Sequence, residues 1–163
     1  MTFRHLAAAG AALLLAGSAA AAAAAPPAQF LRQAIEGDNS EIQLGKLAQS
    51  QGASQGVKDF GRTLEQDHTT ALGQASQTAQ KMGVTPPKDV MPEARKEKAK
   101  LKGLHGAAFD REFVRYMIQD HKKDISKFEQ QAAGKDQTAE LARQTLPTLR
   151  KHLQVAESLQ GRG

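Results

Sequence analysis

The segment VKDFGRTLEQDHTTA, residues 57–71, carries the clearest helical pattern in the chain. Across residues 55–82, apolar and small side chains recur at spacings of three and four, which is the period of one helix face. The stripe consists of Val57, Gly61, Leu64, Ala71, Ala75 and Met82. His68 falls on the same stripe, where the pattern requires an apolar residue. The segment therefore predicts an amphipathic helix with one polar residue on its buried face.

Three other segments show the same period without any strand-like alternation. They cover residues 29–51, 107–133 and 137–159. Each has one polar residue on its apolar stripe, namely Glu41, His121 and His152 in turn. Pro147 predicts a kink or a restart within the last segment, because proline cannot donate a backbone hydrogen bond. The pattern predicts an all-α four-helix bundle with one polar intrusion per helix.

The connections between these helices differ greatly in length. Gly52-Ala53-Ser54 is short enough to make the first two helices antiparallel neighbours, with Ser54 as the N-cap of the second. Residues 83–106 form one long connection between helices two and three, and its charged run 93–102 predicts a short surface helix. The connection either runs the length of the bundle, making helices two and three parallel, or wraps around one end.

The N-terminal 25 residues have the layout of a secretory signal peptide. Arg4 and His5 precede an apolar core at residues 6–16, and an alanine run at residues 19–25 offers cleavage sites. We expect residues 26–163 to form a single domain that is periplasmic or secreted, without a membrane span.

Composition excludes several kinds of chemistry. The chain has no cysteine, so disulfides, thiolate metal sites and lipidation of an N-terminal cysteine are excluded. Its formal net charge of +5 is spread among acidic residues, which argues against a nucleic-acid-binding stripe. No phosphate-binding glycine loop or nucleophile motif is present, so hydrolase and nucleotide-binding functions are not expected. The sequence identifies no protein partner.

The four polar intrusions are expected to meet inside the bundle. Glu41, His68 and His121 lie near the middle of their helices, and His152 lies a little past the middle of its own. Midpoints of helices of similar length share one layer whichever way each helix points, and facing helices pack about 8–10 Å apart. The sequence therefore predicts one mid-bundle layer that contains Glu41, His68, His121 and His152.

Three imidazoles and a carboxylate in an enclosed layer predict a site for a divalent copper, zinc or iron ion. Glu65, Asp67, Asp120 and Asp124 lie close enough in sequence to hold these ligands through hydrogen bonds. The alternative is a polar layer in which the same acidic residues satisfy the buried histidines and no metal is bound. The residues leave both interpretations open.

Four segments also resemble a known bacterial family. They are EIQLGKLAQSQG (41–52), VKDFGRTLEQDHTTA (57–71), GAAFDREFVRYMIQDH (106–121) and LPTLRKHLQVAESL (146–159). In these segments the chain resembles the domain-of-unknown-function 4142 family, whose members are secreted, ferritin-like bundles often labelled outer membrane proteins. The resemblance implies a fold and a compartment but no activity.

The match to ferritin-like di-iron proteins is incomplete. Their sites use a Glu from each of two helices and a Glu-x-x-His from each of the other two. Glu41 and Glu65-x-x-His68 provide half of this set, whereas His121 and Leu149 stand where carboxylates are needed. We therefore expect a non-enzymatic metal-binding bundle. The alternatives are a structural or interaction module of the envelope without a metal and, less favoured, a ferritin-like redox enzyme.

Overall fold

The computed structural model describes residues 24–160, and the regular structure in this range is entirely helical. The helices are α1 (Pro27–Gln51), α2 (Gln55–Lys81), α3 (Pro92–Lys102), α4 (Gly106–Ala132) and α5 (Gln137–Gln160). The all-α prediction is confirmed. The described range holds five helices rather than four, and the additional one, α3, lies where a short helix was predicted in the connection. None of these helices is long and apolar enough to cross a membrane. The expected signal peptide, residues 1–25, lies almost wholly outside the described residues.

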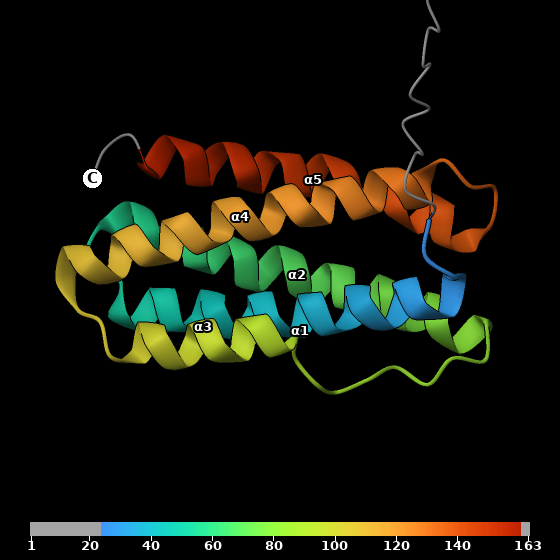
Figure 1. Ribbon diagram of the computed structural model, residues 1–163, viewed down its shortest axis with the longest axis horizontal. Helices are drawn as coiled ribbons and strands as arrows, with labels where there is room; N and C mark the ends of the chain where they lie inside the picture. Colours follow the sequence, from blue (N-terminus) through green and yellow to red (C-terminus); the bar gives the residue numbers. More distant parts are fainter. Residues whose placement is uncertain (1–23, 161–163) are drawn as a thin grey trace, which may run out of the picture.

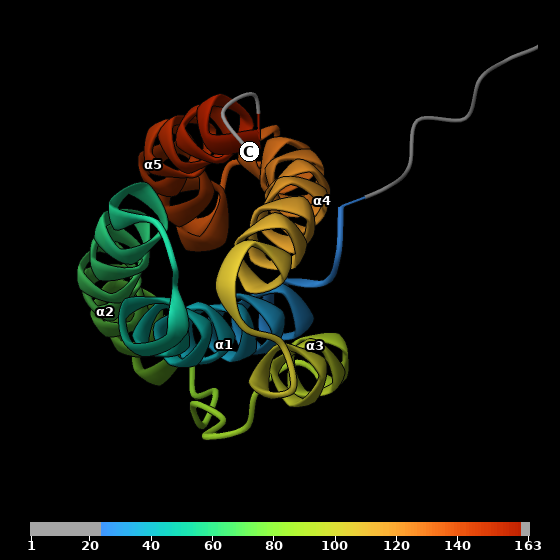
Figure 2. The same cartoon turned by 90° about the vertical axis from the view of Figure 1, so that its left-hand side faces the viewer.

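Four long helices surround one interior, and α3 lies outside them. Seen end-on, α1, α2, α5 and α4 form a ring, with α3 packed against α1 and α4 (Figure 2). Ser54 caps α2 as predicted, since its hydroxyl accepts a hydrogen bond from the backbone N–H of Val57 at 3.3 Å. The last helix, α5, continues through Pro147 without a restart.

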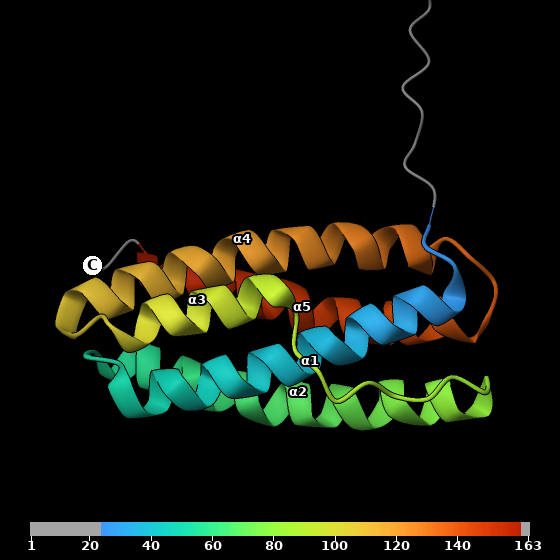
Figure 3. The same cartoon turned by 60° about the horizontal axis from the view of Figure 1, so that its bottom comes forward.

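The long connection runs back along the bundle, so α2 and α4 point the same way (Figures 1 and 3). Two side chains of α1 hold it in place. The Asn39 amide donates to the carbonyl of Asp89 at 3.1 Å, and the Ser40 hydroxyl accepts from the backbone N–H of Met91 at 2.9 Å. Of the two paths predicted for this connection, the structure has the one that follows the length of the bundle.

The helices α1 and α2 approach each other closely at a pair of glycines. A Cβ atom added to Gly45 would lie 2.6 Å from the carbonyl oxygen of Gly61, and one added to Gly61 would lie 2.6 Å from that of Gly45. No side chain fits between two backbones at that distance. The contact sets the spacing of α1 and α2 two turns before His68.

The buried apolar residues form two clusters, one toward each end of the bundle. The first includes Leu44, Leu64, Phe113, Met117, Ile118 and Ala156, and the second includes Ile35, Ala75, Phe128, Leu146 and Leu149. Each long helix has at least one buried polar side chain between its residues of the two clusters. These side chains are Asp38, Glu41, His68, His121 and His152. The polar residues therefore occupy a layer in mid-bundle.

Candidate metal centre

Three histidines from three helices converge in this layer. His68 comes from α2, His121 from α4 and His152 from α5, and at most 5% of any of them is exposed. Each offers one ring nitrogen to a group of three atoms that lie within 4.8 Å of one another. The described residues thus show the predicted convergence of these three side chains. Its physical basis is the common depth of the three helix midpoints.

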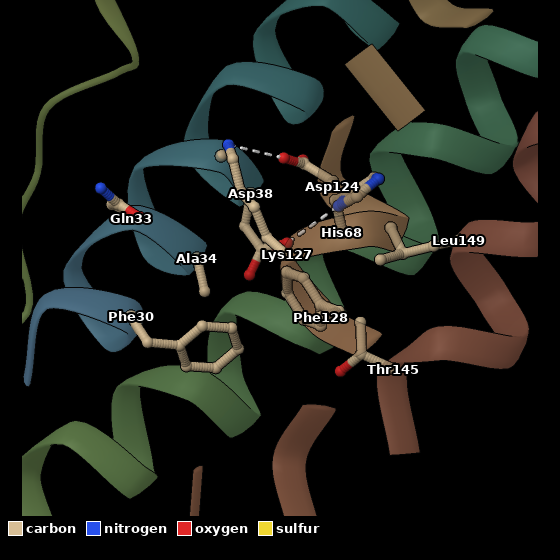
Figure 4. A pocket seen from close by; sticks show the side chains of 11 residues that line it. Phe30, Gln33, Ala34, Asp38, His68, Asp124, Lys127, Phe128, Thr145 and Leu149 are labelled. Carbon is tan, nitrogen blue, oxygen red and sulfur yellow. Dashed lines mark hydrogen bonds and ion pairs between the residues drawn. The ribbon is translucent and has the colours of Figure 1, made fainter. Parts of the chain in front are cut away.

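The outer nitrogen of His68 is held by α1. Its Nδ1 lies 2.8 Å from Oδ1 of Asp38 (Figure 4). Burial raises the pKa of Asp38, and the hydrogen bond with His68 opposes that rise. Since a carboxylate only accepts, Nδ1 carries the ring proton in this pair. Nε2 then has a free lone pair, and it is buried without a hydrogen-bonding partner among the described residues.

His121 is oriented by its own helix. Its Nδ1 lies 3.0 Å from the carbonyl oxygen of Met117, one turn earlier in α4. A carbonyl oxygen can only accept, so Nδ1 carries the proton of the neutral ring and Nε2 has the lone pair. Burial, helped by the charges of the other two histidines, lowers the pKa of His121 to about 3. The ring is therefore neutral at physiological pH.

His152 repeats this arrangement with its nitrogens exchanged. Its Nε2 lies 2.9 Å from Oδ2 of Asp67 in α2, and its Nδ1 faces Nε2 of His121 at 3.3 Å. Burial lowers the pKa of His152 to about 4, although the hydrogen bond with Asp67 opposes this shift. Nε2 donates to the carboxylate, so Nδ1 of the neutral ring has the lone pair.

The three inward nitrogens therefore all present lone pairs to one buried space. Nε2 of His68, Nε2 of His121 and Nδ1 of His152 have no proton to share while the rings are neutral. Two facing lone pairs at 3.3 Å do not form a hydrogen bond, but each can bind a cation. Histidines that bind metals typically donate their other N–H to a carboxylate or a backbone carbonyl, as Asp38, Met117 and Asp67 allow here.

Glu41, predicted as the fourth ligand, lies in the same layer but outside the group of three histidines. It is 1% exposed, and its carboxyl group faces Asp120 of α4. Neither of its oxygens has a hydrogen bond of good geometry among the described residues. Burial, together with repulsion from Asp120, raises the pKa of Glu41 well above its usual value. Burial, together with repulsion from Asp124, raises the pKa of Asp120 to about 6.

Of the four acidic residues predicted to hold the histidines, one contacts a histidine and three have other partners. Asp67 contacts a histidine of the layer, although that histidine is His152 and not its neighbour His68. Glu65 instead accepts a hydrogen bond from Gln49 at 2.6 Å and pairs with Lys46 at the surface. Asp120 faces Glu41, and Asp124 pairs with Lys127. Only Asp67 of the four is hydrogen-bonded to one of the three histidines in the described chain.

Asp38 holds His68 and was not assigned this role from the sequence. One sequence signal could have found it. Asp38 lies on the apolar stripe of α1 one turn before Glu41, and it is buried like the other stripe residues. A second acidic residue on a buried stripe needs a partner, because burying an unpaired carboxylate is costly.

The comparisons with known proteins add a family to this description. The sequence model of the family described as "Domain of unknown function (DUF4142)" matches residues 13–159. The chain belongs to the DUF4142 family. The resemblance seen in its four segments is thereby confirmed. A search of curated proteins found no match to this DUF4142 chain.

The DUF4142 chain also has a structural relative. It is similar to the crystal structure of a DUF305 fragment from Deinococcus radiodurans, with a TM-score of 0.76 and 21% sequence identity. The similarity covers 87% of this chain and 100% of the fragment. At this identity the likeness shows the fold alone, so the function must be argued from the three histidines.

Proposed function

We propose that this DUF4142 protein is a non-enzymatic, metal-binding helical bundle of the bacterial envelope. It binds a divalent transition metal ion, copper or zinc in preference to iron, through His68, His121 and His152. The predicted signal peptide supports an envelope location. The connection that keeps α2 and α4 parallel supports a ferritin-like arrangement.

The observation that carries this proposal is the convergence of three imidazole nitrogens, one from each histidine, within 4.8 Å of one another. Each histidine is fixed by an oxygen acceptor on its outer nitrogen, so that the inner lone pair cannot turn away. Metal ligands must be deprotonated, and burial keeps His121 and His152 neutral. Imidazole suits copper and zinc, and a three-histidine set leaves a further position for water or another small ligand.

The test is the metal content and affinity of protein purified without a histidine tag. We expect about one ion per chain, as three ligands in one buried group imply. A His68→Ala/His121→Ala double variant should lose at least about 100-fold in affinity, since two of the three ligands are gone. His105→Ala is the matched control, because His105 is exposed and lies outside the histidine layer. Sub-stoichiometric metal in the wild type, with unchanged affinity in the double variant, would rule out the proposal.

A second candidate function is a structural or interaction module whose polar layer fixes the register of the helices. Its supporting observation is that apolar clusters on both sides of the layer pack without the histidines. Replacing the three histidines with leucine or glutamine would then leave the fold intact and its stability similar or higher. A catalytic di-iron role has little support, because Leu149 stands where a ligand before His152 is required and Glu41 lies outside the histidine group.

A further inference from the structure

Among the described residues, two surface openings have His68 in their lining. One is a cleft between α2 and α5, and its lining includes Asp67, His68, Thr70, Gln144, Thr145 and Thr148. The other is the pocket between α1, α4 and α5 shown in Figure 4, which includes Asp38, His68 and Lys127 among its lining residues. His68 is common to both, so an ion from solvent could approach it from either side.

The two openings differ in size. The pocket beside α1 has a volume of about 20 Å³, and Phe30, Ala34, Phe128 and Leu149 supply much of its wall. That volume admits about one water molecule. The cleft between α2 and α5 has a volume of about 190 Å³, and its walls carry threonine and glutamine side chains. Only the cleft has room for an ion that still carries part of its hydration shell, with hydroxyl and amide groups to replace lost water.

The charged residues of the two openings also differ. The pocket beside α1 is lined by Asp38, Asp124 and Lys127, and the Lys127 ammonium group pairs with Asp124 at 3.1 Å. None of the described residues that line the cleft is lysine or arginine. The cleft instead contains Asp67, whose side chain is 37% exposed. One of its oxygens, Oδ2, is bonded to Nε2 of His152, and the other makes no hydrogen bond among the described residues. Asp67 therefore links the solvent-facing cleft to the buried layer.

We propose that the α2–α5 cleft is the route by which a divalent metal ion reaches the three histidines, with the Asp67 carboxylate as its first oxygen ligand. The inference rests on the proposed metal-binding function. An exposed carboxylate in a cleft without positive charges raises the local cation concentration and so the association rate. Entry on this side leads to His68, which lines the cleft, and to Asp67, which is hydrogen-bonded to His152.

The test is the rate at which the full, untagged chain takes up Cu²⁺, followed by the change in Cu²⁺ absorption after rapid mixing. Asp67→Asn should slow association about three- to tenfold and weaken its dependence on salt, because the attracting charge is gone. Thr148→Lys places a positive charge in the cleft without removing a ligand. It should slow association and dissociation by similar factors and leave the dissociation constant within about threefold of the wild type.

Lys127→Gln is the matched control at the other opening, because it removes the ammonium group from the pocket beside α1. We expect its association rate to equal that of the wild type. Faster uptake in Lys127→Gln, with no change in Thr148→Lys and Asp67→Asn, would overturn the proposed route and place uptake at the other opening. Equal rates in all variants would also overturn it. In both cases stoichiometric Cu²⁺ binding would remain, whereas failure of the wild type to bind Cu²⁺ would refute the metal-binding function itself.

Discussion

Oδ1 of Asp38 lies 2.8 Å from Nδ1 of His68, and this hydrogen bond joins α1 to α2 across 30 residues of sequence. Both side chains are almost fully buried, with 11% and 6% of their surface exposed. The first helix supplies none of the three histidines. Its contribution to the layer is therefore to orient His68, a ligand of the proposed metal site.

Removing the Asp38 carboxylate should weaken metal binding without removing a ligand. We expect Asp38→Ala to lower the affinity about 10- to 100-fold, the usual effect of losing a hydrogen-bonding partner of a metal-binding histidine. Asp38→Asn, whose amide oxygen can still accept from Nδ1, should lose less. A competition titration with a chelator measures both. The control is Asp59→Ala, since Asp59 pairs with Arg62 on the surface. An affinity of Asp38→Ala equal to that of the control would contradict this role.

His121 should make the metal-free protein sensitive to mild acid. Its pKa is about 3 in the folded chain, so the folded ring stays neutral while the unfolded ring gains a proton below about pH 6.5. The unfolded state therefore binds more protons, and stability falls as the pH drops below that value. At about pH 5 this single group costs about 2 kcal/mol.

His121→Leu cannot be protonated, so it should recover about 2 kcal/mol relative to the wild type between about pH 7 and about pH 5. Urea denaturation of the metal-free proteins at both pH values measures the difference. His105→Leu is the control, because His105 is exposed and lies outside the histidine layer. A pH dependence that is the same for His121→Leu and the wild type would show that burial of His121 is not the cause.

Asp120 should change the folding stability with pH in the opposite direction to His121. Its folded pKa of about 6 lies above its ordinary value of 3.8, so the folded state holds the proton more tightly than the unfolded state. The stability that this provides is complete below about pH 4 and is lost as the pH rises through about 6. Asn cannot ionise, so Asp120→Asn should gain about 2 kcal/mol over the wild type between about pH 4 and about pH 7. Denaturant titrations across this pH range measure the free energy of unfolding of both proteins. A difference between them that does not change with pH would contradict the prediction.

The glycine contact between α1 and α2 should tolerate no added methyl group. Gly61→Ala brings a Cβ atom within 2.6 Å of the Gly45 carbonyl oxygen and 2.8 Å of Ala48 Cβ, so the helices must separate. We expect a loss of about 1–3 kcal/mol. Gly73→Ala is the matched control in the same helix, because nothing lies within 4 Å of its added Cβ. It should stabilise the protein by about 0.5–1 kcal/mol. Thermal unfolding followed by circular dichroism compares the two, and equal melting temperatures would refute the close contact.

Periodicity was sufficient to predict the helices and the convergence of the histidines. The predicted helix ends agree with the structure to within two residues, since glycine, proline and Ser54 mark them clearly. His68, His121 and His152 each interrupt an apolar stripe near a helix midpoint. Such a residue must face the interior, whatever the exact rotation of its helix.

Periodicity could not predict how far each helix is rotated about its own axis. Asp38 and Glu41 are three residues apart, so their side chains point about 60° away from each other around α1. Which of them faces His68 and which faces Asp120 depends on how α1 packs against both neighbours. Glu65 is offset from His68 in the same way, and its carboxylate turns toward Gln49 at the surface. A site residue that lies at the edge of a stripe therefore cannot be assigned from spacing alone.

The three histidines come from α2, α4 and α5, and Asp67 and Asp38 tie them to α2 and α1. No single segment of the sequence contains enough ligands to bind the ion, so the site exists only while the whole bundle is assembled. A bound Cu²⁺ ion would then serve as an internal reporter of tertiary structure. Its visible absorption should vanish at the same denaturant concentration as the native packing, and short peptides cut from this chain should remain colourless.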